Sequence, residues 1–330
     1  MSLAARDEKK TSAAAVDCSV VIVTWNRPEL LRSCLVRLQR SVSESGLVCE
    51  IWVVDNGSTA GDADLVAAEF PSVKLIRSPA NVGFARANNL ALRRATGRYC
   101  LLVNNDVLVP PDALRGLAEF MDSRPEVGVA GASLVDANGN RQRSYGTTLT
   151  LAEALADELH LTTLLRRLPA LPAPGADSAD AGPDWREVGY VSGAFFAIRR
   201  EVLDAVGLLD ERFDFYSEEM DWCARARRVG WKVATLSHVS AVHHHGATAR
   251  SKAELFHAVR LESRRRFLEK YHGPLASLAY RAAAGIGALA LMLRSAFPGG
   301  GRSRSQRFRT AVSALSWAFR GRQPWPPASD

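Results

Sequence analysis

The residues best suited to chemistry in this chain are acidic, and the first of them follows a run that predicts a buried strand. The apolar run LLV stops at Asn104, Asn105 and Asp106. Polar side chains at the carboxyl end of a core strand lie at the rim of the sheet, where open α/β folds bind ligands. The Asp106 carboxylate is a hard oxygen ligand, suited to Mg²⁺ or Mn²⁺ carrying a diphosphate. Taken alone, these residues also fit a strand-terminating turn.

A second acidic group lies among aromatic residues. Glu218, Glu219 and Asp221 come just before or beside Trp222, and the expected helix continues to three arginines. Carboxylates favour a helix N-terminus, so a solvated helix start is the alternative interpretation. Next to aromatic side chains, however, the pKa of a carboxyl group can be raised enough for general-base catalysis.

Two more polar segments follow expected strands. Asp55 ends the run EIWVVD and could accept hydrogen bonds from a nucleobase or ribose, with an Asx turn as the alternative. His243 and His244 follow the run VATLSHVSAV. Neighbouring side chains of an extended segment point to opposite faces, so at most one or two of these histidines could reach a given metal. A structural histidine pair is the alternative.

The elements that would position these residues alternate between strand and helix. Runs typical of buried strands lie at residues 18–24, 50–55, 73–78 and 99–106. Helical patterns lie between them, at residues 25–42, 62–70 and 83–96. This alternation predicts βαβ units and a parallel sheet, and continuously apolar strands require helices on both faces. We therefore expect an α/β fold with a mostly parallel central sheet flanked by helices.

The ends of the chain and one internal segment differ in composition from this core. Residues 1–17 carry charges where a signal peptide needs an apolar run, so we expect a disordered lead. Residues 166–185 are rich in Pro, Ala, Gly and Asp, which predicts a flexible loop. The five cysteines are odd in number and form no CxxC pair. They favour a reducing, cytoplasmic location and argue against a disulfide framework or a zinc site.

The C-terminal segment is basic. From Arg250 onward it contains 15 Lys and Arg but 4 Asp and Glu, although the net charge of the whole chain is only +7. An apolar run at 275–297 is interrupted by Arg281 and Arg294, which leaves too few uncharged residues for the roughly 20 of a membrane span. We expect an interfacial membrane helix, with a helix packed on its own domain as the alternative, and a membrane surface as partner in place of nucleic acid.

Taken in order, these segments resemble the inverting glycosyltransferases of family 2, which have the GT-A fold, and most closely the bacterial rhamnosyltransferase-like branch. The matching segments are SVVIVTWNRPELL, VVDNGST, NVGFARANN, LLVNNDV, VSGAFFAIRREVLDAVGLLDERF, YSEEMDWCARARRVGW and HHHGAT. The resemblance implies a catalytic domain at 18–250, with a donor part at about 18–135 and an acceptor part at about 186–250. Residues 251–330 would then form a basic, helical extension.

The resemblance also implies functions for individual residues. The residues expected to bind the donor are Thr24, Asp55, Arg86, Asn89, Asn105 and Asp106. Glu219 would be the catalytic base, with Glu218 as the alternate. The acceptor would contact Gly193, Asp221 and Trp222. A divalent metal, Mg²⁺ or Mn²⁺, would be held by Asp106 and His243, with His244 as the alternate.

The implied reaction is transfer of a sugar, with inversion, from a dTDP- or UDP-linked donor. L-rhamnose from dTDP-rhamnose is the expected group, and the acceptor would be a hydroxyl of a cell-surface glycan or of a polyprenyl-diphosphate-linked sugar. The protein would work on the cytoplasmic face of the plasma membrane. Asn104 stands where the simplest DxD motif has an acid, so we expect weak or optional metal dependence.

Two other classes of protein remain as alternatives. A nucleotidyltransferase usually has a glycine-rich phosphate loop near its N-terminus, and the segment TWNRPELL has no glycine. A non-catalytic nucleotide-sugar or glycan-binding protein would not need Glu219 together with Asp106 and a histidine.

Overall fold

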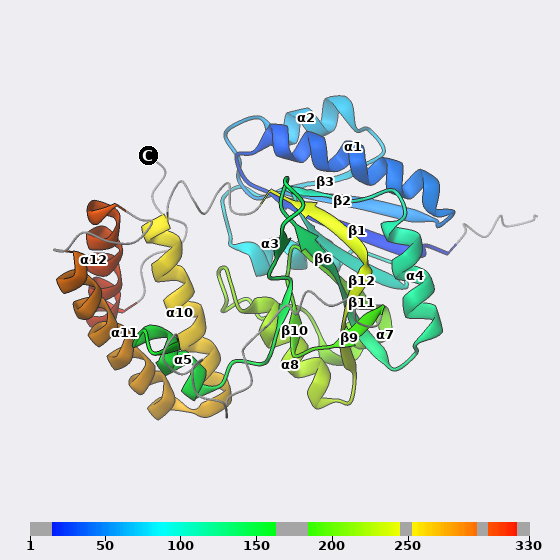
Figure 1. Cartoon of the computed structure of the whole chain (residues 1–330). Coiled ribbons are helices and arrows are strands. Elements are labelled where there is room, and N and C mark those ends of the chain that lie inside the picture. Colours follow the sequence, from blue (N-terminus) through cyan, green and yellow to red (C-terminus); the bar gives the residue numbers. More distant parts are fainter. Residues whose placement is uncertain (1–14, 163–183, 245–252, 296–302, 322–330) are drawn as a thin grey trace, which may run out of the picture.

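The structure is a computed structural model, and it describes residues 15–162, 184–244, 253–295 and 303–321. The expected lead at 1–17 and the expected loop at 166–185 lie almost wholly outside the described residues. A ten-stranded mixed sheet forms the centre of the molecule, and a group of helices lies beside it (Figure 1). The predicted α/β fold with a helical C-terminal extension is confirmed.

The first half of the sheet is parallel, as predicted. It contains β1 (Cys18–Thr24), β2 (Cys49–Asp55), β3 (Lys74–Arg77) and β4 (Tyr99–Asn104). In register, Thr24 pairs with Asp55 and Val23 pairs with Asn104. Because parallel strands end at one edge, the polar residues that follow β1, β2 and β4 meet there.

The second half of the sheet is mixed, which the parallel pattern did not predict. β11 (Phe195–Arg199) lies antiparallel between β4 and β6 (Val127–Val135). β12 (Lys232–His243) runs parallel to β6 and antiparallel to β5 (Val107–Leu108). Two short strands, β7 (Arg141–Gln142) and β9 (Trp185–Glu187), pair with β6 and β12. These pairings bring the ends of β4 and β12 together at the site described below.

Helices cover both faces of the sheet, which explains its continuously apolar strands. One face contacts α1 (Pro28–Ser45), α2 (Asp62–Glu69) and α4 (Ala113–Ser123). The other contacts α3 (Phe84–Leu92), α7 (Arg200–Val206) and α8 (Glu218–Arg228). In β1, the buried Val20 and Ile22 face the first group and Val21 faces the second.

The C-terminal helices form a unit of their own beside the sheet (Figure 1). This unit contains α10 (Ala253–His272), α11 (Pro274–Ser295), α12 (Arg304–Arg320) and, from the middle of the chain, α5 (Leu151–Glu158). A short two-stranded sheet, β8 (Tyr145–Gly146) with β10 (Tyr190–Val191), lies outside the main sheet. Tyr280 is buried in the helical unit and donates to the Glu158 carboxylate at 2.9 Å. The unit is therefore built from two separate parts of the sequence.

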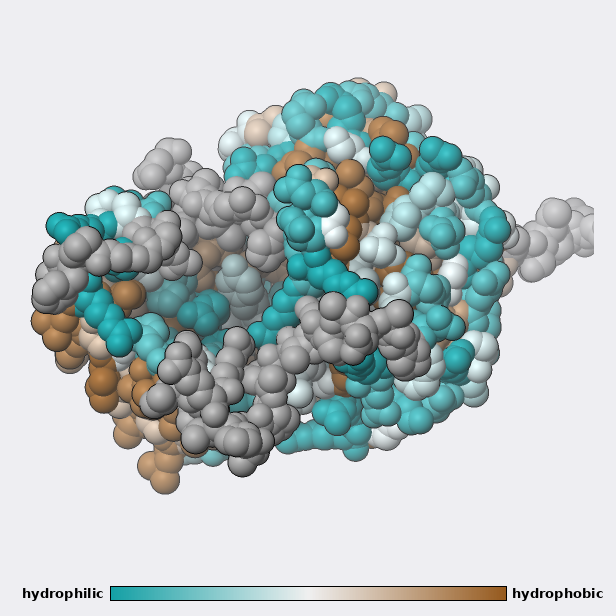
Figure 2. Space-filling model, viewed as in Figure 1, coloured by the Kyte–Doolittle hydropathy of each residue, from teal (hydrophilic) through white to brown (hydrophobic). Residues whose placement is uncertain are grey.

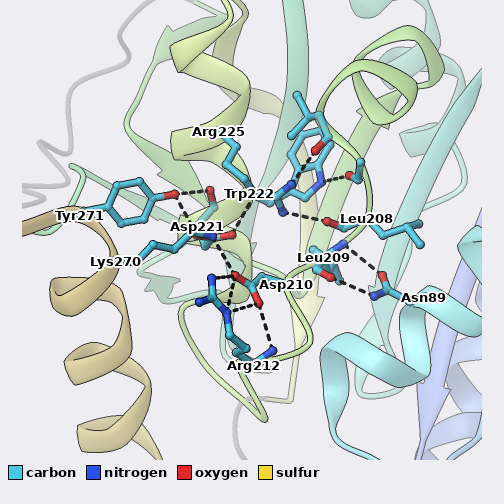
Figure 3. A network of polar contacts seen from close by, with 12 residues as sticks. Asn89, Leu208, Leu209, Asp210, Arg212, Asp221, Trp222, Arg225, Lys270 and Tyr271 are labelled. Carbon is cyan, nitrogen blue, oxygen red and sulfur yellow. Dashed lines mark hydrogen bonds and ion pairs between the residues drawn. The ribbon is translucent and has the colours of Figure 1, made fainter. Parts of the chain in front are cut away.

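A polar network attaches α10 to α8 (Figure 3). The buried Asp221 carboxylate accepts from Tyr271 at 2.8 Å and forms ion pairs with Arg225 and Lys270. Lys270 also contacts Asp210 at 2.8 Å. Removing one partner of a buried ion pair leaves a charge uncompensated, so this network fixes the helical unit against the helix that carries the acidic residues.

Candidate active site

A cavity of about 260 Å³ lies at the carboxyl ends of β1 and β4. Its walls come from the ends of these strands, the loop at Gly193, the start of α8, the end of β12 and the first turns of α10. Its polar lining residues include Thr24, Asn56, Asn81, Asn104, Asn105, Asp106, Ser192, Glu218, Glu219 and His243. Its aromatic lining residues are Trp25, Phe84, Phe215, Tyr216 and Phe256. This is the edge of an α/β sheet at which ligands bind.

Two neighbouring carboxyl groups at the start of α8 face this cavity. Glu218 is buried, and Glu219 is partly exposed as a residue because it lines the cavity. The Oε2 atom of each is buried and has no hydrogen-bond partner within the described residues. Burial raises the pKa of Glu219 to about 7. Burial and the nearby Glu219 raise the pKa of Glu218 well above its usual value. With a pKa near 7, Glu219 can serve as a proton acceptor near neutral pH.

The backbone before these acids is held in an uncommon conformation. Tyr216 and Ser217 both have φ of 69°, in the left-handed region that costs a residue with a side chain about 1–2 kcal/mol. Phe256 of α10 packs edge-on against this turn and holds it in place. The centroid of its ring lies 5.4 Å from that of Phe215 and 6.4 Å from that of Tyr216. Strained turns of this kind concentrate at functional sites.

Asp106 and His243 lie together because Asp106 directly precedes β5 and His243 ends β12, which pairs with β5. β5 and β12 pair His243 with Val107, and the His244 backbone N–H donates to the Asp106 carbonyl at 2.9 Å. This register places His243 Nε2 3.3 Å from Asp106 Oδ1. His244, the predicted alternate ligand, does not line the cavity.

The two side chains fit one divalent metal. Neighbouring ligands of an octahedral ion bound at 2.0–2.1 Å lie about 3.0 Å apart, close to the 3.3 Å between these atoms. The Asp106 carboxylate suits Mn²⁺ or Mg²⁺, and a neutral imidazole is a common nitrogen ligand for metals in proteins. In the described parts of the chain, no three His, Cys, Asp or Glu side chains are grouped to hold a metal. A bound ion would therefore need oxygen ligands from phosphate and water, as Mg²⁺ sites commonly do.

Hydrogen bonds order the part of the cavity at the end of β1. The Thr24 hydroxyl donates to Asp62 at 2.5 Å and accepts from the Asn105 amide at 3.0 Å. Asp55 is buried at the end of β2, where it accepts from the Ser58 backbone at 3.0 Å. Thr24 and Asn105 line the cavity, whereas Asp55 does not. Asp62, which the sequence prediction did not include, thus fixes the Thr24 hydroxyl.

Gly193 lies next to Glu219, the predicted base. A Cβ atom at Gly193 would come within 4.0 Å of the Glu219 Cβ atom. A larger residue there would fill the space in front of Glu219. Gly193 therefore lines the cavity beside Glu219, and its contact with an acceptor stays a prediction.

Besides Asp55 and His244, four predicted site residues do not line the cavity and instead contact other parts of the protein. Arg86 is exposed, and its Nε atom lies 3.7 Å from Oε2 of Glu211. Asn89 is buried and bonds to both the backbone N–H and the carbonyl of Leu209. The two residues predicted to touch the acceptor, Asp221 and Trp222, are fully buried.

Asp221 belongs to the network of Figure 3. Trp222 donates to the Gly207 carbonyl at 2.8 Å and packs edge-on against Phe196. Both residues therefore position α8, and direct contact with an acceptor would require α8 to move.

The sequence prediction also missed three residues at the site. Phe256 lies beyond the segment that resembles the family, and Tyr216 was seen only as one of several aromatics. Gln142 carried no sequence signal, although its side chain contacts His243. Of the three, only Tyr216 could have been found, from its place two residues before Glu218.

Comparison with known proteins identifies the family. The model described as glycosyl transferase family 2 matches residues 19–207, more than half of the chain. The chain belongs to glycosyl transferase family 2. Two curated relatives of this glycosyltransferase are each 25% identical to it.

The first is the N-acetylglucosaminyl-diphospho-decaprenol L-rhamnosyltransferase of Mycobacterium tuberculosis, matched over 63% of this chain and 71% of the relative. The second is the low-salt glycan biosynthesis hexosyltransferase Agl10 of Haloferax volcanii, matched over 76% and 75%. These similarities support the predicted rhamnosyltransferase-like branch.

A solved structure agrees on the fold of this glycosyltransferase. The mannosyltransferase PcManGT from Pyrobaculum calidifontis, in complex with GDP-Man and Mn²⁺, is similar with a TM-score of 0.55 at 17% identity. The match covers 95% of this chain and 90% of the mannosyltransferase. The predicted GT-A fold and glycosyltransferase class are confirmed.

Proposed function

We propose that this enzyme transfers a hexose from a nucleotide-linked donor to an acceptor hydroxyl by a single displacement that inverts the anomeric carbon. One observation carries the proposal: a buried carboxyl group whose pKa is raised to about 7, Glu219, lines the same cavity as Asp106 and His243. Glu219 would take the proton of the attacking hydroxyl, and Glu218 remains the alternate base.

Each part of the cavity has a task in this reaction. Asp106 and His243 would hold a divalent ion, which, when bound, neutralises the charge that develops on the diphosphate leaving group. Thr24 and Asn105, fixed by Asp62, would bind the nucleotide side of the donor. Glycosidases use a second carboxyl group to protonate the leaving group, and a metal makes that acid unnecessary here. With a single protein carboxylate as ligand, metal dependence would be weak or optional.

The proposed donor is dTDP-L-rhamnose, with UDP-linked sugars as the alternative. The rhamnosyltransferase relative of Mycobacterium tuberculosis supports this choice, and the name of that relative also suggests a polyprenyl-diphosphate-linked acceptor. A cell-surface glycan is the other acceptor class. Purified protein assayed against a panel of nucleotide sugars, with release of nucleoside diphosphate as the readout, tests the proposal. Release from none of them, with lipid-linked or glycan acceptors present, would refute it.

We also propose that the enzyme contacts the inner face of the plasma membrane through α11 and α12. The outer side of α11 presents large apolar residues, including Leu275 at 80% exposure and Leu293 at 72%. The inner side presents small residues such as Ala284 and Gly287. Figure 2 shows apolar residues gathered along the outer side of the helical unit. A helix that serves only the protein's own core would place its large apolar residues inward.

Charge supports a membrane over a second copy of the chain as the partner. Residues 274–295 and 304–320 contain six arginines and no acidic residue. Such a surface attracts anionic lipids, whereas two copies meeting through it would bring like charges together. Among the described helices, α11 is long and apolar enough to cross a membrane, but 39% of that stretch is buried in the protein. A membrane contact along the outer side of α11 leaves the packing of its inner side against the protein unchanged.

Co-sedimentation with phosphatidylglycerol vesicles tests the membrane contact. We expect the variant with Leu278→Gln and Leu289→Gln to lose binding, and the control Val36→Gln, an exposed apolar position on α1, to keep it. Equal binding by both variants would overturn the proposal. Self-association of the wild type that the double variant abolishes would favour a dimer surface instead.

A further inference from the structure

Gln142, on the short strand β7, makes two hydrogen bonds to a single residue. Its Nε2 donates to the His243 carbonyl at 2.8 Å. Its Oε1 lies 2.9 Å from His243 Nδ1. The sheet brings the two residues together, because Gln142 pairs with Leu134 on β6 and β6 pairs with the end of β12. Gln142 therefore contacts both the backbone and the ring of His243, the histidine beside Asp106.

These two contacts determine which ring nitrogen carries the proton. A backbone carbonyl can only accept, so the amide nitrogen of Gln142 must face it and the amide oxygen must face the ring. An amide oxygen is an acceptor, so His243 Nδ1 must be the donor in this contact. In the neutral ring, Nε2 then carries a lone pair.

The Nε2 lone pair points toward a carboxylate. His243 Nε2 lies 3.3 Å from Asp106 Oδ1, so two electron-pair donors face each other, which is the arrangement that a shared metal ion requires. Without Gln142, the Asp106 carboxylate would itself be the stronger acceptor for a ring N–H. The proton would then move to Nε2 and close the ligand position.

We propose that Gln142 is a positioning residue that holds His243 in the Nδ1–H tautomer, so that the lone pair on Nε2 can bind the metal. Metal-bound histidines commonly donate their other N–H to such a partner, and losing that partner typically lowers metal affinity about 10- to 100-fold. The inference rests on the metal site of the proposed function and adds a residue from a different strand to it.

The test compares Gln142→Leu and Gln142→Glu with the control Arg141→Ala, an exposed position on the same strand. Gln142→Leu removes both hydrogen bonds, whereas Gln142→Glu keeps an acceptor at Nδ1. Two readouts are needed: the His243 tautomer, from ¹⁵N chemical shifts of the imidazole above its usual titration range, and Mn²⁺ affinity, from the free Mn²⁺ signal in electron paramagnetic resonance. Thermal unfolding without metal shows whether each variant is folded.

We expect Gln142→Leu to shift the tautomer toward Nε2–H and to weaken Mn²⁺ binding about 10- to 100-fold. Gln142→Glu and Arg141→Ala should stay within a few-fold of wild type. An unchanged tautomer in folded Gln142→Leu, or an unchanged Mn²⁺ affinity, would overturn the inference. Wild-type protein that binds no Mn²⁺ would overturn it too. Nucleotide release that survives a chelator would then show that glycosyl transfer itself still holds.

Discussion

Replacing Glu219 with Gln should abolish catalysis and, at the same time, stabilise the protein in alkaline solution. A general base contributes about 10²- to 10⁴-fold to a rate, equal to about 3–5 kcal/mol of activation free energy. We expect Glu219→Gln to lose at least this factor in turnover while still binding the donor. In the wild type, kcat/KM should fall about tenfold per pH unit below about 7, where Glu219 becomes protonated.

The stability effect follows from the direction of the pKa shift. Burial raises the pKa of Glu219 from 4.5 to about 7, so the folded state holds the proton more tightly than the unfolded state. The stabilisation from the bound proton is complete below about pH 4.5 and is lost as pH rises through about 7. The shift corresponds to at most about 3 kcal/mol, because water in the cavity screens part of the charge. Glutamine is uncharged at every pH, so Glu219→Gln does not lose this stabilisation as the pH rises.

Urea unfolding of the wild type and Glu219→Gln at about pH 8 and about pH 5 measures the effect. The gain in unfolding free energy should be up to about 3 kcal/mol at the higher pH and much smaller at the lower. For turnover, Glu218→Gln is the matched control, since it alters the neighbouring carboxyl group and leaves the proposed base. An equal stability difference at both pH values would contradict the burial argument. Near-normal turnover of Glu219→Gln with an inactive Glu218→Gln would move the base to Glu218.

Three further changes test other parts of the structure. Asp106→Ala should weaken Mn²⁺-dependent donor binding by about tenfold or more, and titration calorimetry that gives the same donor affinity with and without Mn²⁺ in the wild type would argue against a metal ligand. Lys270→Met leaves the buried Asp221 carboxylate with one cationic partner fewer. The free energy of unfolding should fall by about 2 kcal/mol, less than the 3–5 kcal/mol lost when a buried pair is fully broken. An unchanged urea midpoint would show that the network does not hold α10. Gly287→Ala would bring a Cβ atom 1.8 Å from the Glu158 carbonyl oxygen. Helix α11 must then shift, which should lower the free energy of unfolding by about 1–3 kcal/mol. An unchanged melting temperature would contradict the close contact of α5 and α11.

The sequence allowed much of the fold to be predicted, because its strands and helices have strong local patterns. The run CSVVIVT is buried on both sides in β1, as expected of a strand between two helical layers. The antiparallel insertion of β11 was not predictable in this way, since apolar strands look alike whichever direction they run. The place of α5 in the C-terminal unit was hidden for a similar reason: helix α5 and Tyr280 are far apart in sequence and meet only through tertiary contacts.

The place of a candidate residue was predictable where that residue lies next to the end of a regular element. Asp106 lies in the turn after β4, Glu219 lies in the first turn of α8, and both line the cavity. Asp221 and Trp222 share the same helix as Glu219 but point into the protein, because successive helical residues are turned by about 100°. Gln142 illustrates the opposite case, since it matters only through the residue that folding places beside it.

The anomeric configuration of the product tests the central claim most directly. The donor that supports nucleotide release in the panel should be incubated with its acceptor, and the new glycosidic bond examined by NMR as it forms. A single displacement assisted by Glu219 predicts a product whose anomeric configuration is opposite to that of the donor. A product that retains the donor's configuration would contradict the proposed mechanism.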